Sequence, residues 1–161
     1  MRKISNEAFN ELYYQYKPMI YNIAYTYVHN VHDADDIVQE VFLKYLKSTE
    51  EFAGKNNEKY WLIRVTINTA KSFVTSSWRK KVILDEETID KQKNNDSDSN
   101  DDLFEIIYSL PRKYKEVIVL YYYEDLMIAE IASILSISQS ACKKRLERAR
   151  NLIRAREVKN G

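Results

Sequence analysis

Basic side chains gather near the end of the chain, on one face of a predicted helix. Residues 139–161 contain eight Lys or Arg against two Asp or Glu. Four of the charged residues recur at helical spacing and would face solvent together: Lys143, Lys144, Glu147 and Arg148. Such cations can neutralise phosphates, and side chains near the start of the helix can reach base edges in the major groove of DNA. A solvated charged face is the alternative interpretation.

The residues around this face predict a helix-turn-helix. The apolar positions Ile128, Ile131, Ala132 and Leu135 would form one buried helix face, and Cys142, Leu146, Ala149 and Ile153 the next. Ile137 lies in the short break between them, and Ser138 is the expected N-cap of the second helix. Two helices joined by about three residues form the motif that places its second helix in the major groove.

Composition favours long helices and excludes several classes of protein. The 161 residues include two Gly, two Pro and one Cys. Few glycines allow few tight turns, and a single Cys cannot staple a secreted disulfide scaffold. No apolar run approaches the roughly 18 residues of a membrane span, and no signal peptide is visible, so we expect a cytoplasmic protein. No phosphate loop, nucleophile motif or metal-ligand cluster is apparent, so we expect no enzyme, cofactor, metal or small-molecule substrate.

Charge divides the chain into three parts. The net charge is +3 over residues 1–84, −6 over 85–102 and +4 over 103–161. The acidic segment has one strongly apolar residue, Ile89, so it cannot bury enough surface to order itself. The expected fold class is therefore all-α, with two small helical domains joined by a flexible acidic linker. Eighteen extended residues reach on the order of 60 Å, which lets the two blocks contact DNA sites about two turns apart.

Three helices are predicted in the first block. In the first helix, apolar and aromatic residues recur at spacings of three and four: Phe9, Leu12, Tyr16, Ile20, Ile23 and Tyr27. The second begins near Asp33, its expected cap, and buries Ile37, Val38, Val41, Phe42, Tyr45 and Leu46. A loop is predicted over 52–59. The third helix runs from about Tyr60 to Ser77, buries Trp61, Leu62, Val65 and Phe73, and ends in Arg79, Lys80 and Lys81.

One surface of the first block and two helices of the second block complete the prediction. Asp36, Gln39 and Glu40 share the outer face of the second helix, where they act either as ordinary first-turn stabilisers or as a docking surface for a basic partner. In the second block, one helix covers Leu103 to Leu110 and stops at Pro111, and another covers 115–123.

Three segments resemble the sigma factors of bacterial RNA polymerase. They are DADDIVQEVFLKYL (33–46), YWLIRVTINTAKSF (60–73) and the stretch 110–150, in the family's order and with family-like spacing. The extracytoplasmic-function (ECF) group, which keeps only conserved regions two and four, is the most similar. The resemblance implies region two in 1–84, the connector in 85–102 and region four in 103–161. It also implies an alternative sigma factor that binds core RNA polymerase and promoter DNA.

The resemblance implies roles for particular residues of region two. Asp36, Gln39 and Glu40 would dock on the clamp helices of the polymerase β′ subunit. Asn68, Lys71 and Ser72, together with the loop Lys55–Lys59, would capture an unstacked base of the −10 promoter element. The amide of Asn suits this because it both donates and accepts hydrogen bonds. The run Arg79, Lys80 and Lys81 would hold phosphates.

Region four would read the −35 element and contact the β flap of the polymerase. The implied DNA-reading residues are Ser140, Lys143, Lys144, Glu147 and Arg148. The chain departs from the family where Ser140-Ala141-Cys142 replaces Gly-Thr-Val, where Lys144 replaces a small hydroxyl residue, and where Met127 replaces a Ser or Thr cap. The resemblance also implies control by an anti-sigma factor.

Two other functions stay open on the sequence alone. One is a stand-alone helix-turn-helix regulator that binds operators, and the other is a protein-docking module with a solvated basic tail. The acidic linker is either a plain tether or a segment that mimics nucleic acid near the RNA path of the polymerase. A stand-alone regulator would need a ligand pocket or a dimer seam in the first block.

Overall fold

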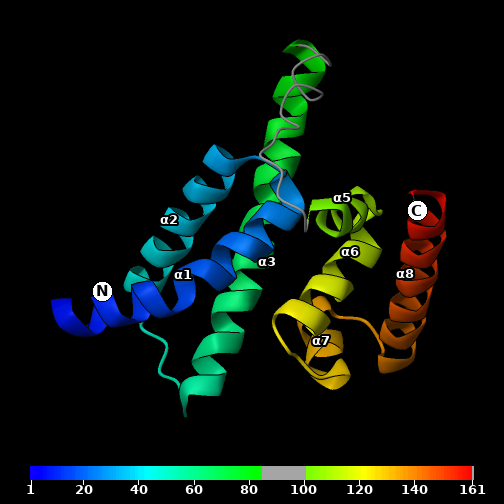
Figure 1. Cartoon of the computed structure of the whole chain (residues 1–161). Helices are drawn as coiled ribbons and strands as arrows, with labels where there is room; N and C mark the ends of the chain where they lie inside the picture. Colours follow the sequence, from blue (N-terminus) through cyan, green and yellow to red (C-terminus); the bar gives the residue numbers. More distant parts are fainter. Residues whose placement is uncertain (85–100, 161) are drawn as a thin grey trace. The chain divides into compact units, whose positions relative to one another are not determined.

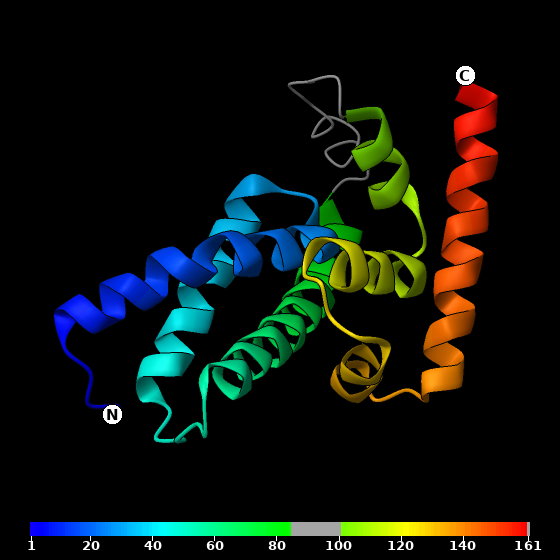
Figure 2. The ribbon, with the colours of Figure 1, turned by 60° about the horizontal axis from the view of Figure 1, so that its bottom comes forward.

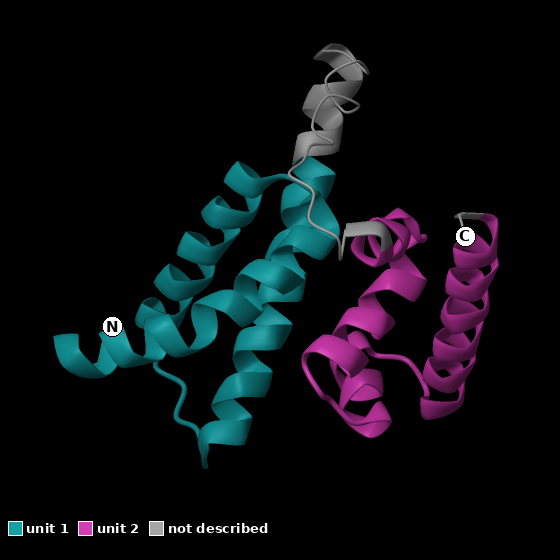
Figure 3. Ribbon diagram, in the orientation of Figure 1, with its two compact units in different colours: residues 1–85 teal, residues 86–161 magenta. Residues whose placement is uncertain are grey.

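The computed structural model describes the backbone of residues 1–84 and 101–160, and the side chains of 1–76 and 103–159. The chain divides into two compact units, Met1–Asp85 and Glu86–Gly161 (Figure 3). The regular structure of the described residues is entirely helical, which confirms the all-α prediction. Most of the predicted acidic linker, residues 85–100, lies outside the described residues. No described helix is long and apolar enough to span a bilayer.

Unit 1 is a bundle of three helices that pack against one another (Figures 1 and 2). They are α1 (Asn6–Val28), α2 (Val31–Lys47) and α3 (Lys55–Leu84). The core side chains include Leu12, Tyr16, Ile20, Ile23, Ile37, Val38, Val41, Phe42, Leu62, Ile63 and Ile67. The apolar faces predicted for the first two helices are therefore confirmed, with Phe9 and Leu46 half-buried at their edges.

The start of α2 differs from the prediction. Asn30, not Asp33, is the N-cap, and its Oδ1 accepts a hydrogen bond from the Asp33 backbone N–H at 2.9 Å. His29 adopts the left-handed conformation (φ 52°) that ends α1, and its N–H donates to the carbonyl of Tyr25. This abrupt end leaves two residues, His29 and Asn30, between α1 and α2, and Asn is as good a cap as Asp. Asp33 instead lies in the first turn, where the helix dipole favours its negative charge.

The predicted loop over 52–59 was wrong after Gly54, because α3 begins at Lys55. The Glu58 backbone N–H donates to the carbonyl of Gly54 at 3.2 Å. The Glu58 carboxylate accepts a hydrogen bond from the Tyr45 hydroxyl at 2.8 Å. These contacts outweigh the weak helix propensity of Asn56 and Asn57.

The far end of α3 and its buried face also differ from the prediction. The helix continues through the basic run to Leu84 instead of ending near Ser77. Of the residues predicted to be buried, Leu62 is fully inside, whereas Trp61, Val65 and Phe73 are half-buried. The residues of α3 that are buried in the core instead lie on the adjacent face of the helix: Ile63, Thr66, Ile67, Thr69 and Ala70.

Unit 2 contains α5 (Asp101–Ser109), α6 (Arg112–Ile118), a π-helical turn η1 (Val119–Tyr123), α7 (Ile128–Leu135) and α8 (Gln139–Asn160). The prediction of a single α-helix over 115–123 was wrong, because the α-helix ends at Ile118 and a wider π-helical turn follows. In η1 the Glu124 N–H reaches the Val119 carbonyl at 3.2 Å, five residues back.

The helix-turn-helix prediction is confirmed by α7 and α8, which pack against each other. Ser136 takes the left-handed conformation (φ 58°) at the end of α7, and the Ile137 N–H donates to the Ala132 carbonyl at 3.0 Å. Ile131, Cys142 and Leu146 are fully buried, so the predicted apolar faces do meet.

Candidate nucleic-acid interface

The start of α8 presents a continuous polar face. The Ser138 hydroxyl accepts a hydrogen bond from the Ala141 N–H at 3.0 Å, which confirms Ser138 as the cap. The exposed residues of the following turns include the predicted set Ser140, Lys143, Lys144 and Glu147. They lie opposite the buried positions Cys142, Leu146 and Ala149. Within the described part of the chain, Lys143 and Lys144 form no ion pair, so their charges are available to phosphates.

Arg148 lies at the edge of this face, and its side chain contacts α6. Its side chain hydrogen-bonds to Tyr114, and that bond is the main reason why the pKa of the Tyr114 hydroxyl lies below its ordinary value. The Lys113 ammonium, 5.1 Å from the Tyr114 ring centroid, adds to the effect. Arg148 is exposed, but its guanidinium therefore already has a partner within unit 2.

Three further arginines of α8 are committed to contacts within the unit. Arg145 lies 3.8 Å from the buried carboxylate of Glu116. The Nε of Arg150 donates to the Tyr122 hydroxyl at 2.6 Å, and Arg156 donates to the Ser109 hydroxyl. The count of basic residues over 139–161 therefore overstates the charge that α8 offers to a partner.

The departure at Met127 changes how α7 begins. Met127 occupies the N-cap position with a 65% exposed side chain. Its own backbone N–H donates to the Glu130 carboxylate at 2.8 Å. Glu130 thus supplies one half of a capping box, and α7 forms where expected without a hydroxyl cap.

The second predicted nucleic-acid contact lies along α3. Asn68 and Ser72 are exposed and Lys71 is half-buried, and their spacing puts all three on one face. The neighbouring face is inside the bundle, where Thr69 accepts a hydrogen bond from the Lys44 ammonium at 2.9 Å. The predicted phosphate ligands Arg79, Lys80 and Lys81 belong to the last turns of α3, and their side chains lie outside the described residues.

The segment Lys55–Lys59 is not brought together with Asn68. Both belong to one helix, and Lys59 is nine positions before Asn68. In a regular helix that is about 14 Å along the axis and half a turn around it. The loop predicted over Lys55–Lys59 is therefore the first turn of α3, while its role in base capture together with Asn68 stays a prediction.

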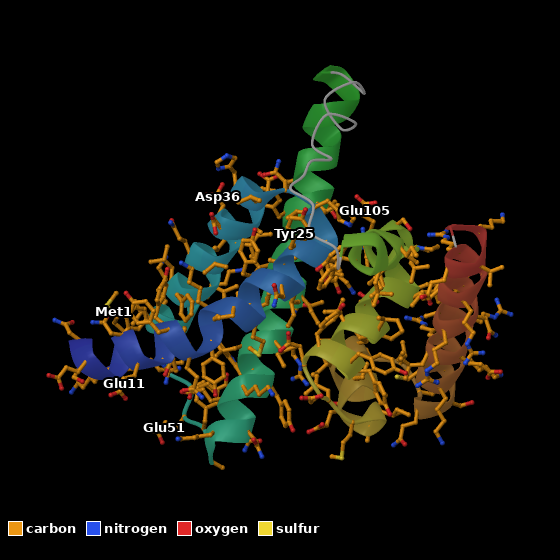
Figure 4. All side chains as sticks on the ribbon, in the orientation of Figure 1. Met1, Glu11, Tyr25, Asp36, Glu51 and Glu105 are labelled. Carbon is orange, nitrogen blue, oxygen red and sulfur yellow. The ribbon has the colours of Figure 1, made fainter. Side chains whose placement is uncertain are left out.

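The outer face of α2 carries Asp36, Gln39 and Glu40, all exposed. Figure 4 shows Asp36 pointing away from the bundle near the start of the helix. Leu43 continues the same face one turn later and is 54% exposed. The sequence reading missed this apolar side chain, although its spacing of three from Glu40 was a visible signal.

Comparison with known proteins identifies both units. The family model described as Sigma-70 region 2 matches residues 12–80, and the model Sigma-70, region 4 matches residues 101–153. RNA polymerase sigma factor SigV of Bacillus subtilis is 36% identical over 147 residues, covering 89% of this chain and 87% of that protein. The ECF RNA polymerase sigma-E factor of Haemophilus influenzae is 31% identical, covering 91% and 86%.

Solved structures share the fold. The sigma factor RpoE, crystallised with the anti-sigma factor NepR from Bartonella quintana, has a TM-score of 0.73 at 20% identity, covering 93% of this chain and 96% of that one. CnrH, solved in complex with the cytosolic domain of CnrY, has a TM-score of 0.69 at 20% identity, covering 98% and 92%.

Proposed function

Because the chain belongs to the extracytoplasmic-function group of the sigma-70 family, we propose that its two units divide promoter recognition between them. The protein is an alternative sigma factor, a non-enzymatic subunit that directs promoter-specific transcription by RNA polymerase. Its first block matches a sigma domain, which argues against the stand-alone regulator. In our proposal unit 1 reads the −10 element and docks on the polymerase, and unit 2 reads the −35 element.

The −35 element is read by the exposed start of α8. The observation that carries this proposal is the row of Ser140, Lys143, Lys144 and Glu147 beside a capped helix N-terminus. Lysines in this row neutralise phosphates and fix the register on the duplex. Glu147 accepts from the amino group of a cytosine in the major groove. Arg148, held by Tyr114, contributes at the edge of the footprint.

The −10 element is read by the exposed face of α3. Asn68 donates to and accepts from the edge of an unstacked base, while Lys71 and Ser72, one turn further along, contact its backbone. The basic run Arg79, Lys80 and Lys81 continues the same helix and suits phosphate binding.

Docking on core RNA polymerase uses the outer face of α2. Asp36, Gln39 and Glu40 give it two carboxylates and an amide, and Leu43 adds an apolar side chain at its end. A charged rim around an apolar anchor is the usual anatomy of a protein interface. The partner is the β′ clamp helices, with unit 2 meeting the β flap.

An anti-sigma factor is the proposed regulator. The sigma factor RpoE, which shares the fold of this chain, was solved in complex with the anti-sigma factor NepR, and this supports a partner of the same kind here. The site of action is the cytoplasm, where RNA polymerase works.

Asn68→Ala tests the proposed division of labour. It should lower transcription from the cognate promoter about tenfold, because one base loses a bidentate amide, while affinity for core polymerase is unchanged. Promoter-specific transcript yield and polymerase affinity would be measured on the same preparations. The matched control is Asn22→Ala, which removes an exposed Asn from α1. Equal loss of transcription and polymerase binding in Asn68→Ala would contradict base capture by α3.

A further inference from the structure

The N-terminal segment of unit 1 is bound to the far end of α2 (Figure 1). The backbone N–H of Arg2 donates to the Leu46 carbonyl at 2.7 Å, and its side-chain Nε donates to the Tyr45 carbonyl at 3.0 Å. Both carbonyls belong to the last turn of α2, where few helical donors are left for the backbone oxygens, and the Tyr45 carbonyl also accepts from the Ser48 N–H at 3.2 Å. The positive charge of Arg2 also suits the negative end of the helix dipole. Arg2 thus caps α2 from 43 residues away in sequence.

Arg2 is also packed against two aromatic rings, which in turn contact a third ring on α3. Its guanidinium carbon lies 4.0 Å from the ring centroid of Tyr45 and 5.2 Å from that of Phe52. Phe52 belongs to the connection between α2 and α3, and its centroid lies 5.8 Å from that of Trp61 on α3. The Tyr45 and Trp61 centroids are 6.0 Å apart. The Arg2 cation therefore joins the end of α2 to the connection, and the two rings that it contacts pack against Trp61 of α3.

A second link runs from this cluster into the first turn of α3. The Tyr45 ring lies under Arg2, and its hydroxyl donates to the Glu58 carboxylate. Burial and this hydrogen bond raise the pKa of Tyr45 to about 12, so the hydroxyl remains a donor at neutral pH. The position of Arg2 is thereby coupled through Tyr45 to the turn from which α3 grows.

Arg2 is not placed to bind phosphate. Its Nη2 is buried and has no hydrogen-bond partner within the described part of the chain. A buried N–H without a partner opposes folding, so the rings and the two carbonyls must outweigh that cost. The chemistry of this site is that of a clamp inside unit 1, in contrast to the exposed lysines of α8.

We propose that Arg2 is a positioning residue for promoter reading. It fixes the connection 48–54 and the first turn of α3 on the end of α2, and so sets the direction of the helix that carries Asn68. The inference rests on the proposed role of α3 at the −10 element. It predicts that a residue far from the DNA controls base preference there.

The test is in vitro transcription by core polymerase with the full-length protein, on promoters that share one −35 element and carry a randomised −10 element. Arg2→Ala should lower the yield from the best −10 sequences about tenfold, the cost of one charged hydrogen bond to a buried carbonyl, and flatten the base preference. The matched control is Lys3→Ala, which removes an equal charge from the neighbouring exposed residue and should stay within about twofold of the unchanged protein. Amide hydrogen exchange should quicken over 48–59 and not over α1.

Two outcomes would overturn the inference: an unchanged yield, or a reduced yield with unchanged base preference, which a purely structural role would give. If Arg2→Ala does not fold, Arg2→Lys keeps the charge but loses the planar fork, and it should flatten the preference less. An unchanged preference in Arg2→Lys would then overturn it. Asn68→Ala in the same pool separates the two proposals. If Asn68→Ala alters the preference and the Arg2 variants do not, only the positioning role fails. If Asn68→Ala does not alter it, the −10 role of α3 fails first.

Discussion

The two units place their candidate contacts in different ways. In unit 2 the predicted DNA contacts occupy the first turns of one helix, and a cap, a left-handed Ser136 and a buried apolar face fix that helix locally. In unit 1 the contacts are spread over α2 and α3, and the start of α3 depends on Arg2, Tyr45 and Glu58, which come from three separate segments. A local site can be read from sequence, whereas a site spread over a bundle depends on residues that never touch the ligand.

The two units also differ in how their cations are used. Arg145, Arg150 and Arg156 of α8 bind residues of α6, η1 and α5, leaving Lys143 and Lys144 as the phosphate-facing charges near its start. In unit 1 the acidic face of α2 is the charged surface, and it faces outward. Unit 2 thus offers a cationic surface suited to DNA, whereas unit 1 combines an anionic face on α2, suited to a protein, with the face of α3 that we propose reads the −10 element.

The largest expected effect comes from reversing charge on α2. Glu40→Lys should weaken association with core polymerase by at least about 30-fold, because a like charge would face a basic partner surface. Equilibrium binding to core enzyme would measure it. Glu11→Lys makes the same reversal on an exposed position of α1 and should change affinity less than about threefold. An unchanged affinity in Glu40→Lys would leave this face with only a helix-stabilising role.

A smaller effect is expected at the start of α8, and it separates two kinds of contact. Glu147→Gln should relax the preference at one −35 base pair by about tenfold, because the charged, acceptor-only carboxylate is replaced by a neutral amide that both donates and accepts. Lys143→Ala should weaken binding to all promoters alike. It should also reduce the slope of the logarithm of the binding constant against the logarithm of salt concentration by about 0.9. Holoenzyme binding to a −35 library at several salt concentrations would measure both. If Glu147→Gln behaved like Lys143→Ala, Glu147 would not read a base.

The smallest effect concerns the stability of unit 2 and its pH dependence. Burial, with Arg112 adding to it, lowers the pKa of Lys115 from 10.5 to about 8. Between these values the unfolded chain holds a proton that the folded unit does not, so stability rises with pH. Between pH 7.5 and 9 the gain should be about 1 kcal/mol.

The matched variant for this pH dependence is Lys115→Met, which should remove most of the slope and leave the smaller contribution of Tyr114, whose lowered pKa acts in the same direction. Hydrogen exchange of α6 and α8 would report on unit 2, because both tryptophans, Trp61 and Trp78, belong to unit 1. The window ends at pH 9, since burial raises the pKa of Cys142 and of Tyr123 in the same unit, and these groups give slopes of opposite sign above their ordinary values of 9 and 10. An equal slope in Lys115→Met would show that another group titrates.

Helix periodicity was sufficient to predict most of the fold. The buried faces of α1, α2, α7 and α8 follow from spacings of three and four, and Ser138 was identifiable as a cap. The misses arose where a local rule competed with another contact. Asp33 and Asn30 are equally good caps, and the left-handed His29 decided between them. The loop prediction over 52–59 failed because a Tyr45 hydroxyl, invisible to local patterns, holds Glu58 in a helix.

The candidate site was less predictable than the fold. Exposure of Asn68, Lys143 and Glu147 follows from helix phase alone. The partnership of Arg148 with Tyr114 does not, since it joins residues 34 positions apart in the chain. Periodicity likewise gave no reason to bring Arg2 against Tyr45, because the N-terminal segment has no helical pattern of its own.

The most direct test of the account is in vitro transcription from a pool of promoter fragments, with core RNA polymerase alone, with the unchanged protein, and with Asn68→Ala or Glu147→Gln. We predict discrete start sites that require the protein and share two upstream elements, with Asn68→Ala altering preference only at −10 and Glu147→Gln only at −35. Start sites whose sequence preference neither variant alters, or alters at both elements together, would contradict the division of promoter reading between the two units.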